Sequence, residues 1–269
     1  MTHGLERALN EACDAAMSAA GLVHRDELRF LFLAAALPTA QGEVVEIGSY
    51  KGRSTIALCK GALWAGQTRV IACDPFTAAS AAVSGVPANE SFYDAFADSL
   101  KRHELWQNVE VHREPSAEMA KSWTRPIRLL WIDGDHRYTG VKADLESFLP
   151  HLAPGALVAF HDVGSAEFQG PAMCFADDIL FSDGFGRCGL CHLIGWSQYV
   201  ASGGREASPQ AKMRVCRVLA ARRLRQIFGK KVPWLARWQY RQYRRYSTGR
   251  DFEKWIRPVS PGHGGGLPP

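Results

Sequence analysis

The chain has 269 residues, of which 46% are hydrophobic and 22% charged, and its formal net charge is +5 at pH 7. This size and composition fit one medium globular domain with an appendage. No apolar stretch approaches the roughly 20 residues of a membrane-spanning helix, and the N-terminus lacks the apolar core of a signal peptide, so we expect a cytoplasmic protein.

Two helices are predicted first, at residues 4–20 and 25–37, because RDELRFLFLAAAL consists of good helix formers with an apolar stripe. Strands and helices then alternate, with a small, polar and mobile connection expected at 77–89. The expected strands cover residues 43–50, 68–75, 108–115, 127–135 and 155–163, and the expected helices cover residues 52–66, 90–105, 115–123 and 138–152. This alternation is typical of a parallel sheet with helices on both faces.

The seven cysteines are scattered, odd in number and unaccompanied by an export signal, so we expect reduced thiols. Cys188 and Cys191 lie in CGLCH, which matches the attachment motif of a c-type haem and also suits a structural zinc site. The overlapping segment GLCHLIGW, residues 189–196, is more typical of a late strand. We therefore favour ordinary strand cysteines.

Polar side chains follow several of the predicted strands at the point where each strand ends. The clearest case is WIDGDH at 131–136, where a buried-looking run passes directly into two carboxylates and an imidazole. The carboxyl ends of parallel strands meet at one edge of the sheet, and the ligand crevice lies there. The residues expected at this edge are Glu46, Asp74, Asp133, His161 and Asp162.

The turn EIGSYKGRS at 46–54 lies between the first strand and its helix, and it is not the GxGxxG turn that dinucleotides need for their pyrophosphate. A nucleoside ligand without phosphate, such as S-adenosylmethionine, tolerates a looser loop that begins with an acid. Asp74, at the end of the second strand, is placed to accept hydrogen bonds from ribose hydroxyls.

Three separated segments, EIGSYKGRST, ACDPF and IDGDHRYTGVKADLESFLPHLAPGALVAFHDV, resemble the class I S-adenosylmethionine-dependent methyltransferases in order and spacing. Within that class they resemble a bacterial branch that includes sugar O-methyltransferases, and the resemblance covers about residues 40–195. It implies a Rossmann-like, doubly wound, mostly parallel seven-stranded sheet. It also implies cofactor contacts from Glu46, Gly48, Ser49 and Gly52 at the methionine end, Asp74 at the ribose, Ser116 near the adenine, and Asp133.

Methyl transfer to a hydroxyl benefits from a metal ion that acidifies the hydroxyl and from a nearby base. Asp133, His161 and Asp162 lie at adjacent strand ends, and two oxygens with one nitrogen suit Mg²⁺ or Mn²⁺. The resemblance places metal ligands at these three positions and a catalytic histidine at His136. His161 stands where those families usually carry a carboxylate, which favours Mn²⁺ or another transition metal. Asp135 is expected to cap the following helix.

The basic residues are concentrated near the C-terminus, because residues 212–257 hold fifteen Lys and Arg but only two acids. One amphipathic helix is expected there, with its apolar arc formed by Met213, Cys216, Ala220, Leu224, Ile227 and Phe228 and its basic arc by Arg214, Arg217, Arg222 and Arg225. Three interpretations stay open for 212–257: peripheral contact with an anionic membrane, packing on the domain or on a sister subunit, and nucleic-acid binding.

Four segments are therefore predicted. Residues 1–39 form N-terminal helices on the core, 40–200 the S-adenosylmethionine-binding domain, 201–258 a basic, aromatic, helical extension, and 259–269 a disordered tail. The predicted activity is O-methylation of a sugar, glycan or glycolipid hydroxyl, assisted by Mg²⁺ or Mn²⁺, in the cytoplasm or at the inner membrane face. The alternatives are an RNA-modifying methyltransferase and a non-catalytic binding protein that retains the fold. A homo-oligomer is compatible with the sequence.

Overall fold

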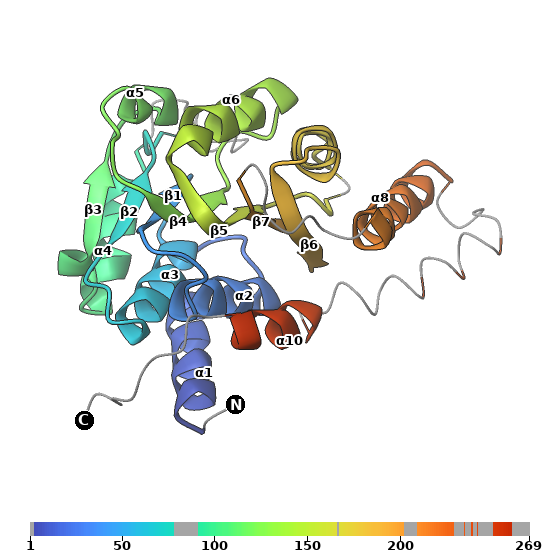
Figure 1. The fold of residues 1–269 in the computed structure, drawn as a ribbon. Helices are drawn as coiled ribbons and strands as arrows, with labels where there is room; N and C mark the ends of the chain where they lie inside the picture. The colour runs from blue at the N-terminus through green and yellow to red at the C-terminus, as the bar shows by residue number, and fades with distance from the viewer. Residues whose placement is uncertain are drawn as a thin grey trace.

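The structure is a computed structural model that describes residues 3–77, 91–165, 167–201, 209–228 and 250–259 and the single residues 234, 238 and 241. Its centre is a seven-stranded sheet with the order β3-β2-β1-β4-β5-β7-β6 (Figure 1). Neighbouring strands from β3 to β5 are parallel, whereas β7 pairs antiparallel with both β5 and β6. The strands are β1 (Glu43–Ile47), β2 (Val70–Cys73), β3 (Val109–His112), β4 (Ile127–Ile132), β5 (Leu152–Phe160), β6 (Phe185–Cys191) and β7 (Ile194–Tyr199).

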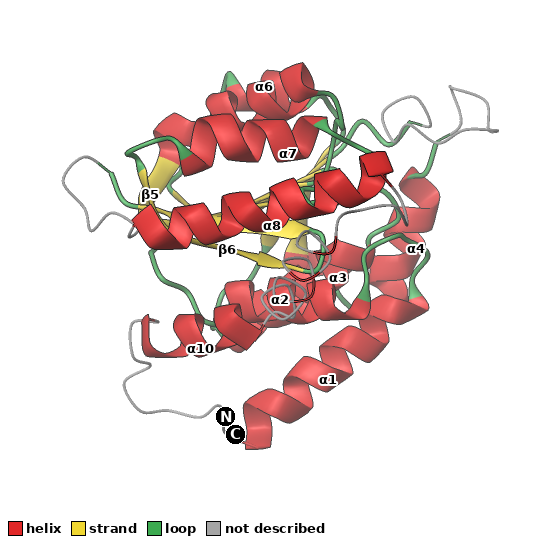
Figure 2. Cartoon of the chain, turned by 90° about the vertical axis from the view of Figure 1, so that its right-hand side faces the viewer, coloured by secondary structure: helices red, strands yellow, loops and turns green. Residues whose placement is uncertain are grey.

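Helices cover both faces of this sheet (Figure 2). One face carries α1 (His3–Ser18), α2 (Arg25–Ala36), α3 (Arg53–Trp64), α4 (Tyr93–Arg102) and α10 (Arg250–Val259). The other carries α5 (Ser116–Ala120), α6 (Tyr138–Phe148), α7 (Gly170–Cys174), a π-helical turn η3 (Phe175–Leu180) and α8 (Pro209–Phe228). Short 3₁₀ turns, η1 (Trp106–Asn108) and η2 (Leu149–His151), precede β3 and β5. The predicted fold class, a mostly parallel sheet between two helical layers, is confirmed.

Strand β4 shows why the sheet is buried on both faces. All of its six residues are buried, with Leu129 and Trp131 in the core under α2 and α3 and Leu130 and Ile132 in the core under α6. A strand of this kind carries apolar side chains in both alternating sets. The charged residue of β4, Arg128, is buried near the start of the strand and donates to the carbonyl of Ala35 and to Gln67. The next charged group, Asp133, follows Ile132 at the carboxyl edge.

The predicted late strand at 189–196 was wrong in one respect, because the structure divides it into the end of β6 and the start of β7. The two antiparallel strands are joined at His192, whose φ of 53° turns the chain. The loops of two-residue hairpins usually contain Gly or Asn, and this loop contains neither. The helical segment from α7 to η3 was not predicted from the sequence.

The basic extension packs partly on the domain. On α8 the buried side is formed by Val215, Val218 and Ala221, whereas Met213 and Ala220 are exposed, so the predicted apolar arc was wrong at these positions. The predicted basic arc was wrong at Arg222, which lies on the packed side and whose Nη2 donates to the carbonyl of His192 at 2.9 Å. A guanidinium on a long stem can reach a backbone acceptor while its methylenes pack.

Helix α10 returns to the N-terminal helices. Phe252 and Ile256 are buried, and the Phe252 ring lies 4.2 Å from that of Phe30 and 5.0 Å from that of Trp196. Glu253 pairs with Arg29 of α2 at 3.2 Å. Packing on the domain, one of the three interpretations of the extension, thus holds for α8 and α10.

Some sequence predictions lie outside the described residues: the connection at 78–90, the segment 202–208, the side chains of Leu224, Arg225, Ile227 and Phe228, and the tail at 260–269. Within the described part of the chain, every helix is too short or too polar to cross a lipid bilayer.

Gly48 fixes the distance between the two central loops of the carboxyl edge. Its φ is +84°, and a Cβ placed there would lie 2.2 Å from the carbonyl oxygen of Asp133. We expect Gly48→Ala to lower the free energy of unfolding by about 3 kcal/mol, since it combines left-handed strain with a backbone collision. Gly66 is the control, because its φ is +78° and nothing lies within 4 Å of an added Cβ. Gly66→Ala is expected to lower the free energy of unfolding in urea by about 1 kcal/mol. Equal losses in the two variants would contradict a collision between the Cβ at residue 48 and the backbone of Asp133.

Candidate active site

A cavity of about 1390 Å³ opens at the carboxyl edge of the sheet. Its walls include the β1–α3 loop, the residues after β2, β4 and β5, and the segment from 165 to 170. Residues 20–23, between α1 and α2, form a further wall, and Arg53 anchors this linker by donating to the carbonyls of Ala19 at 2.8 Å and Val23 at 3.3 Å. The N-terminal helices thus contribute to the cavity.

Glu46 lies beneath the β1–α3 loop and is fully buried. Its Oε2 accepts hydrogen bonds from the hydroxyls of Ser49 at 2.8 Å and Thr55 at 2.6 Å, whereas Oε1 has no hydrogen-bond partner. Burial raises the pKa of Glu46 to about 7, although the hydroxyls of Ser54, Thr55 and Ser49 lower it. Buried polar atoms are normally hydrogen-bonded, so an unpartnered oxygen at this depth is unusual, and Glu46 lies behind the cavity lining, which begins with Ile47 and Gly48 of the same loop.

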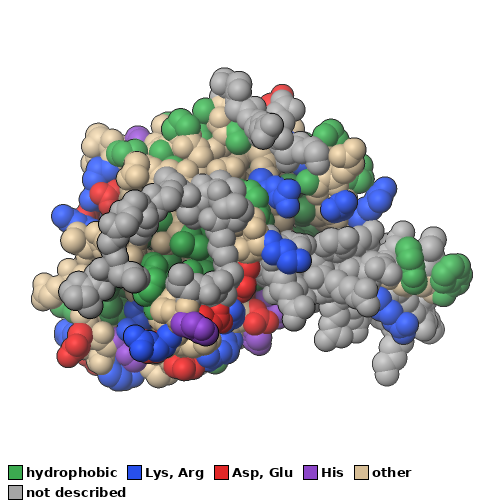
Figure 3. All heavy atoms as spheres, turned by 60° about the horizontal axis from the view of Figure 1, so that its bottom comes forward, with side chains coloured by type: hydrophobic (Ala, Val, Ile, Leu, Met, Phe, Trp, Pro, Cys, Tyr) green, Lys and Arg blue, Asp and Glu red, His purple; other side chains and the backbone are tan. Residues whose placement is uncertain are grey.

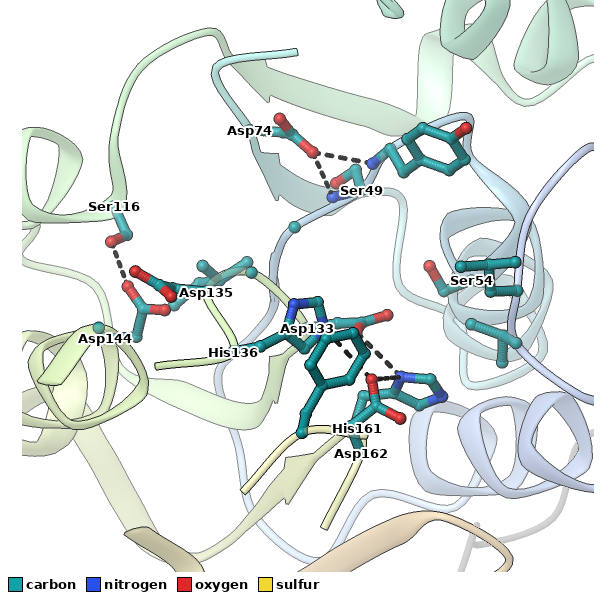
Figure 4. A pocket seen from close by; sticks show the side chains of 18 of the residues that line it. Ser49, Ser54, Asp74, Ser116, Asp133, Asp135, His136, Asp144, His161 and Asp162 are labelled. Carbon is teal, nitrogen blue, oxygen red and sulfur yellow. Dashed lines mark hydrogen bonds and ion pairs between the residues drawn. The ribbon is translucent and has the colours of Figure 1, made fainter. Parts of the chain in front are cut away.

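Asp74 orders the same loop from the neighbouring strand. Its Oδ2 accepts from the backbone N–H of Ser49 at 2.9 Å and of Tyr50 at 2.8 Å, and its Oδ1 accepts from that of Phe76 at 2.5 Å (Figure 4). A carboxylate offers about four lone-pair sites, so three are occupied and about one is left for a ribose hydroxyl. The ribose role of Asp74 stays a prediction.

Ser116 lines the cavity, whereas Gly52 lies in the β1–α3 loop outside the cavity lining. Gly52 precedes α3 with a φ of +88°, and an added Cβ would lie 3.3 Å from the Phe96 ring. The Ser116 hydroxyl donates to Oδ1 of Asp144, whose pKa burial raises to about 6 although this bond lowers it. Asp144 was missed in the sequence, where it reads as one more polar residue of helix α6. Figure 4 shows this pair on the wall of the cavity away from His161.

The strand ends of β4 and β5 bring three potential metal ligands together. Asp133, His136 and Asp162 each offer one ligand atom, and these atoms lie within 4.8 Å of one another. His136 Nε2 is 3.2 Å from Oδ2 of Asp162, while its Nδ1 is buried without a partner. The Phe168 ring stacks on the imidazole at 3.9 Å. Nε2 is therefore the histidine atom that faces the two carboxylates.

His161, the expected third ligand, has both ring nitrogens directed at carboxylates. Nδ1 lies 3.1 Å from Asp133 and 3.3 Å from Asp162, and Nε2 is hydrogen-bonded to Glu27 at 3.3 Å. Burial lowers the pKa of His161, but these three carboxylates outweigh it and hold that pKa well above the usual range. His161 is thus placed as a buried cation. The three residues whose ligand atoms lie close together are Asp133, Asp162 and His136, so His136 takes the place expected for His161.

Glu27 is the site residue that the sequence did not reveal. It is buried at the start of α2, where Oε2 also accepts from the backbone N–H of His24 at 2.7 Å. Its Oε1 accepts from the backbone N–H of Leu193 at 3.0 Å and lies 3.1 Å from His192 Nδ1. The only signal was an acid in the first turn of a predicted helix, and a Glu at that position equally suits a capping box.

Asp135 does not cap α6 as expected. Its Oδ1 accepts from the backbone N–H of Arg137 at 2.7 Å, before the first turn of the helix, and both oxygens contact the Arg137 guanidinium. The carboxylate thus stabilises the turn that carries His136. Asp135 lies on the cavity wall but outside the group formed by Asp133, His136 and Asp162.

Comparison with known proteins identifies the domain. Residues 45–163 match a family model described as a methyltransferase domain. An uncharacterized protein of Sinorhizobium fredii, y4gI, is 29% identical over 133 residues, which are 44% of this chain and 13% of that protein. The chain thus matches only a small part of the length of this curated relative.

Solved methyltransferases share the fold at low sequence identity. PaMTH1 of Podospora anserina, with bound S-adenosylhomocysteine, has a TM-score of 0.52 and 13% identity over 71% of this chain and 87% of its own. The O-methyltransferase TomG of Streptomyces achromogenes, with S-adenosylmethionine, has a TM-score of 0.52 and 16% identity over 72% and 90%. An O-methyltransferase of Bacillus cereus has a TM-score of 0.51 and 21% identity over 71% and 90%.

The buried contact between Glu27 and His161 predicts a stability change. We expect Glu27→Gln to lower the free energy of unfolding at pH 7 by about 3 kcal/mol, because it leaves a buried imidazolium short of one counter-charge. Burial raises the pKa of Glu27, but hydrogen bonds from His161 and His192 outweigh it and lower that pKa from 4.5 to about 2. A carboxyl with a lower pKa in the folded state stabilises above its unfolded pKa and loses this contribution as the pH falls.

The loss should therefore shrink as the pH is lowered from 4.5 towards 2, measured by urea unfolding of both proteins. His192→Gln is the matched control, since it removes another partner of Glu27 and leaves His161 in contact. It is expected to cost about 1 kcal/mol and to depend on pH less than Glu27→Gln does, because it removes only one of the hydrogen bonds that lower the pKa of Glu27. Identical pH curves for the two variants would refute the ionic role of Glu27.

Proposed function

We propose that this chain is a class I S-adenosylmethionine-dependent methyltransferase that methylates a hydroxyl group of a sugar, glycan or glycolipid with the help of a divalent metal ion. The observation that carries the proposal is the convergence of Asp133, His136 and Asp162 in the cavity that the β1–α3 loop also lines. A methyl donor held by the β1–α3 loop and a hydroxyl acceptor held by these three residues would lie in the same cavity.

The loop suits a ligand without phosphate. Glu46 lies buried below it and Asp74 beside it, so a pyrophosphate there would meet two acids, whereas an amine or ribose hydroxyls could donate to them. Glu46, Gly48, Ser49 and Gly52 are assigned to the methionine end and Asp74 to the ribose. Ser116, paired with Asp144, is assigned to the adenine, whose amino group can donate to a carboxylate.

S-adenosylmethionine would supply the methyl group, and a divalent ion would lower the pKa of the acceptor hydroxyl. Asp133 and Asp162 have the oxygen ligands that Mg²⁺ and Mn²⁺ prefer. His136 Nε2, 3.2 Å from Asp162, accepts the proton of the hydroxyl. Because Nδ1 is buried, the same Nε2 cannot hold the ion and take the proton at once. Assigning the ion to the carboxylates leaves the histidine free to act as the base.

His161 supports a second mechanism without a metal ion. Its imidazole lies between Asp133 and Asp162 at 3.1 and 3.3 Å and already compensates part of their charge. The ion would have to bind beside this cation, which costs electrostatic energy. In the second mechanism Asp162 orients His136 and the base acts alone.

The size and lining of the cavity support a saccharide acceptor. Sites for one small ligand occupy about 300–1,000 Å³, so this cavity of about 1390 Å³ has room for an acceptor beside the methyl donor. Lys51, Arg137 and Gln169 line it with hydrogen-bonding groups, and Phe168 adds an aromatic surface. Saccharides bind through this combination of polar groups and flat apolar surface. The likeness to TomG and to the Bacillus cereus protein, both O-methyltransferases, supports oxygen as the acceptor atom.

Calorimetry with S-adenosylhomocysteine tests the donor half of the site. We expect saturable binding to the wild-type protein and a loss of at least about tenfold in affinity for Asp74→Asn, because the amide cannot accept from both loop N–H groups and a ribose. Asp94→Asn, on the first turn of α4, is the control and should bind as the wild type does. Absence of binding to the folded wild type would overturn the proposed function.

Titration with Mn²⁺ tests the metal. We expect binding to the wild type and a loss of at least about tenfold in affinity for Asp133→Asn, since a ligand carboxylate is removed. His136→Gln should change Mn²⁺ affinity by less than about threefold if the histidine acts as base, and by about tenfold or more if it is a ligand. No Mn²⁺ binding by a wild type that binds S-adenosylhomocysteine would refute metal assistance and favour the second mechanism.

A further inference from the structure

Helix α8 is cationic along its whole length. Its 20 residues include six Lys and Arg and no acid. Val215, Val218 and Ala221 face the domain, and the exposed positions include Arg214 and Arg217. A helix packed by a narrow apolar side presents its charge outward, and a row of cations without interspersed acids attracts an anionic partner.

Large hydrophobic side chains are exposed on the same part of the chain. Within the described residues eight such side chains are exposed, and five of them belong to the segment that follows the active-site loops: Met173, Phe181, Met213, Trp234 and Trp238. Lys212 Nζ donates to the carbonyl of Ser182 at 2.7 Å, which places the start of α8 beside Phe181. Exposed apolar side chains that lie close together, as Phe181 and the start of α8 do, mark an interaction site more often than a random surface.

Trp234, Trp238 and Arg241 extend this pattern. All three are helical and exposed, with 76% of Trp234 and 53% of Trp238 accessible to solvent. Their spacing of four and three residues is the spacing of side chains on one side of a helix. Figure 3 shows hydrophobic and cationic side chains together at one end of the molecule.

We propose that Phe181, Met213, Arg214, Arg217, Trp234, Trp238 and Arg241 form a docking surface for an anionic phospholipid membrane. The cations are complementary to lipid phosphates, and indole rings beside guanidinium groups are typical of side chains at the membrane interface. Phosphates of nucleic acid would also attract the cations, but Met213 and Phe181 offer nothing for phosphate recognition. The attachment is peripheral, because the described part of the chain contains no helix able to span a bilayer.

This surface does not depend on methyl transfer. It does suggest why a glycolipid is a suitable acceptor, because a membrane-bound enzyme and a lipid-linked saccharide are confined to the same membrane surface. The η3 turn connects the two regions, because Phe181 follows it directly and α7, which leads into it, begins at Gly170 on the cavity wall.

Co-sedimentation of the full chain with vesicles tests the proposal. We expect binding to vesicles that contain phosphatidylglycerol, weakening as salt is added, and little binding to pure phosphatidylcholine. The double variants Arg214→Gln/Arg217→Gln and Trp234→Ala/Trp238→Ala should each weaken binding at least about tenfold. Equal binding to both kinds of vesicle, or no binding to either, would overturn the proposal.

Matched variants outside the proposed docking surface control for charge and hydrophobicity. Arg7 on α1 is exposed, and so is Lys121, which follows α5, and Arg7→Gln/Lys121→Gln removes the same charge as the first variant. Met17→Ala/Leu63→Ala removes two exposed apolar side chains. Both controls should bind vesicles like the wild type, and equal losses in controls and test variants would contradict a localised surface.

Two further measurements separate the outcomes. S-adenosylhomocysteine affinity should be unchanged in all four variants, so the docking surface and the proposed function can fail independently. A single-stranded RNA oligonucleotide is the competing probe. Tight, salt-sensitive binding of RNA that the arginine variant abolishes, together with no vesicle binding, would reassign the surface to nucleic acid.

Discussion

The buried imidazole of His161, surrounded by the carboxylates of Glu27, Asp133 and Asp162, is the constraint on which the site depends. Charges removed from water must be paired, because the loss of hydration costs more than any single surface contact returns. Each member is therefore fixed by the others. Glu27 comes from α2, His161 and Asp162 from the end of β5, and Asp133 from the end of β4. The cluster therefore joins the N-terminal helices to the carboxyl edge of the sheet.

That edge exists because the central strands are apolar on both sides. Polar atoms of β4 and β5 emerge where the hydrogen-bonded ladder ends, and Gly48 brings the β1–α3 loop against the backbone of Asp133. Asp74 then fixes the other side of the same loop through the N–H groups of Ser49 and Tyr50. Donor and acceptor regions are thus held at one spacing by backbone contacts, and side chains can be tuned within that frame.

The sheet and its polar edge could be predicted because both follow from local patterns. Apolar runs of strand length alternate with helical periods, and parallel strands align their carboxyl ends, so Asp133, His161 and Asp162 had to be neighbours. The division of roles between the two histidines could not be predicted. It depends on Glu27, more than a hundred residues away in sequence, whose position against His161 is decided by tertiary packing. The hairpin at His192 was missed for a related reason, since its turn carries no distinctive residue.

The basic extension shows the limit of a helical wheel. Periodicity states which residues share a side, but the side that is buried is decided by the surface that receives the helix. On α8 the domain accepts Val215, Val218 and Ala221 and lets Arg222 reach a carbonyl, so Met213, assigned to the apolar arc, is left in solvent. Met213 is therefore exposed because Val215, Val218 and Ala221 occupy the side of α8 that packs on the core. An apolar side chain displaced in this way remains available for a second apolar environment, and the neighbouring arginines restrict that environment to one with negative charge.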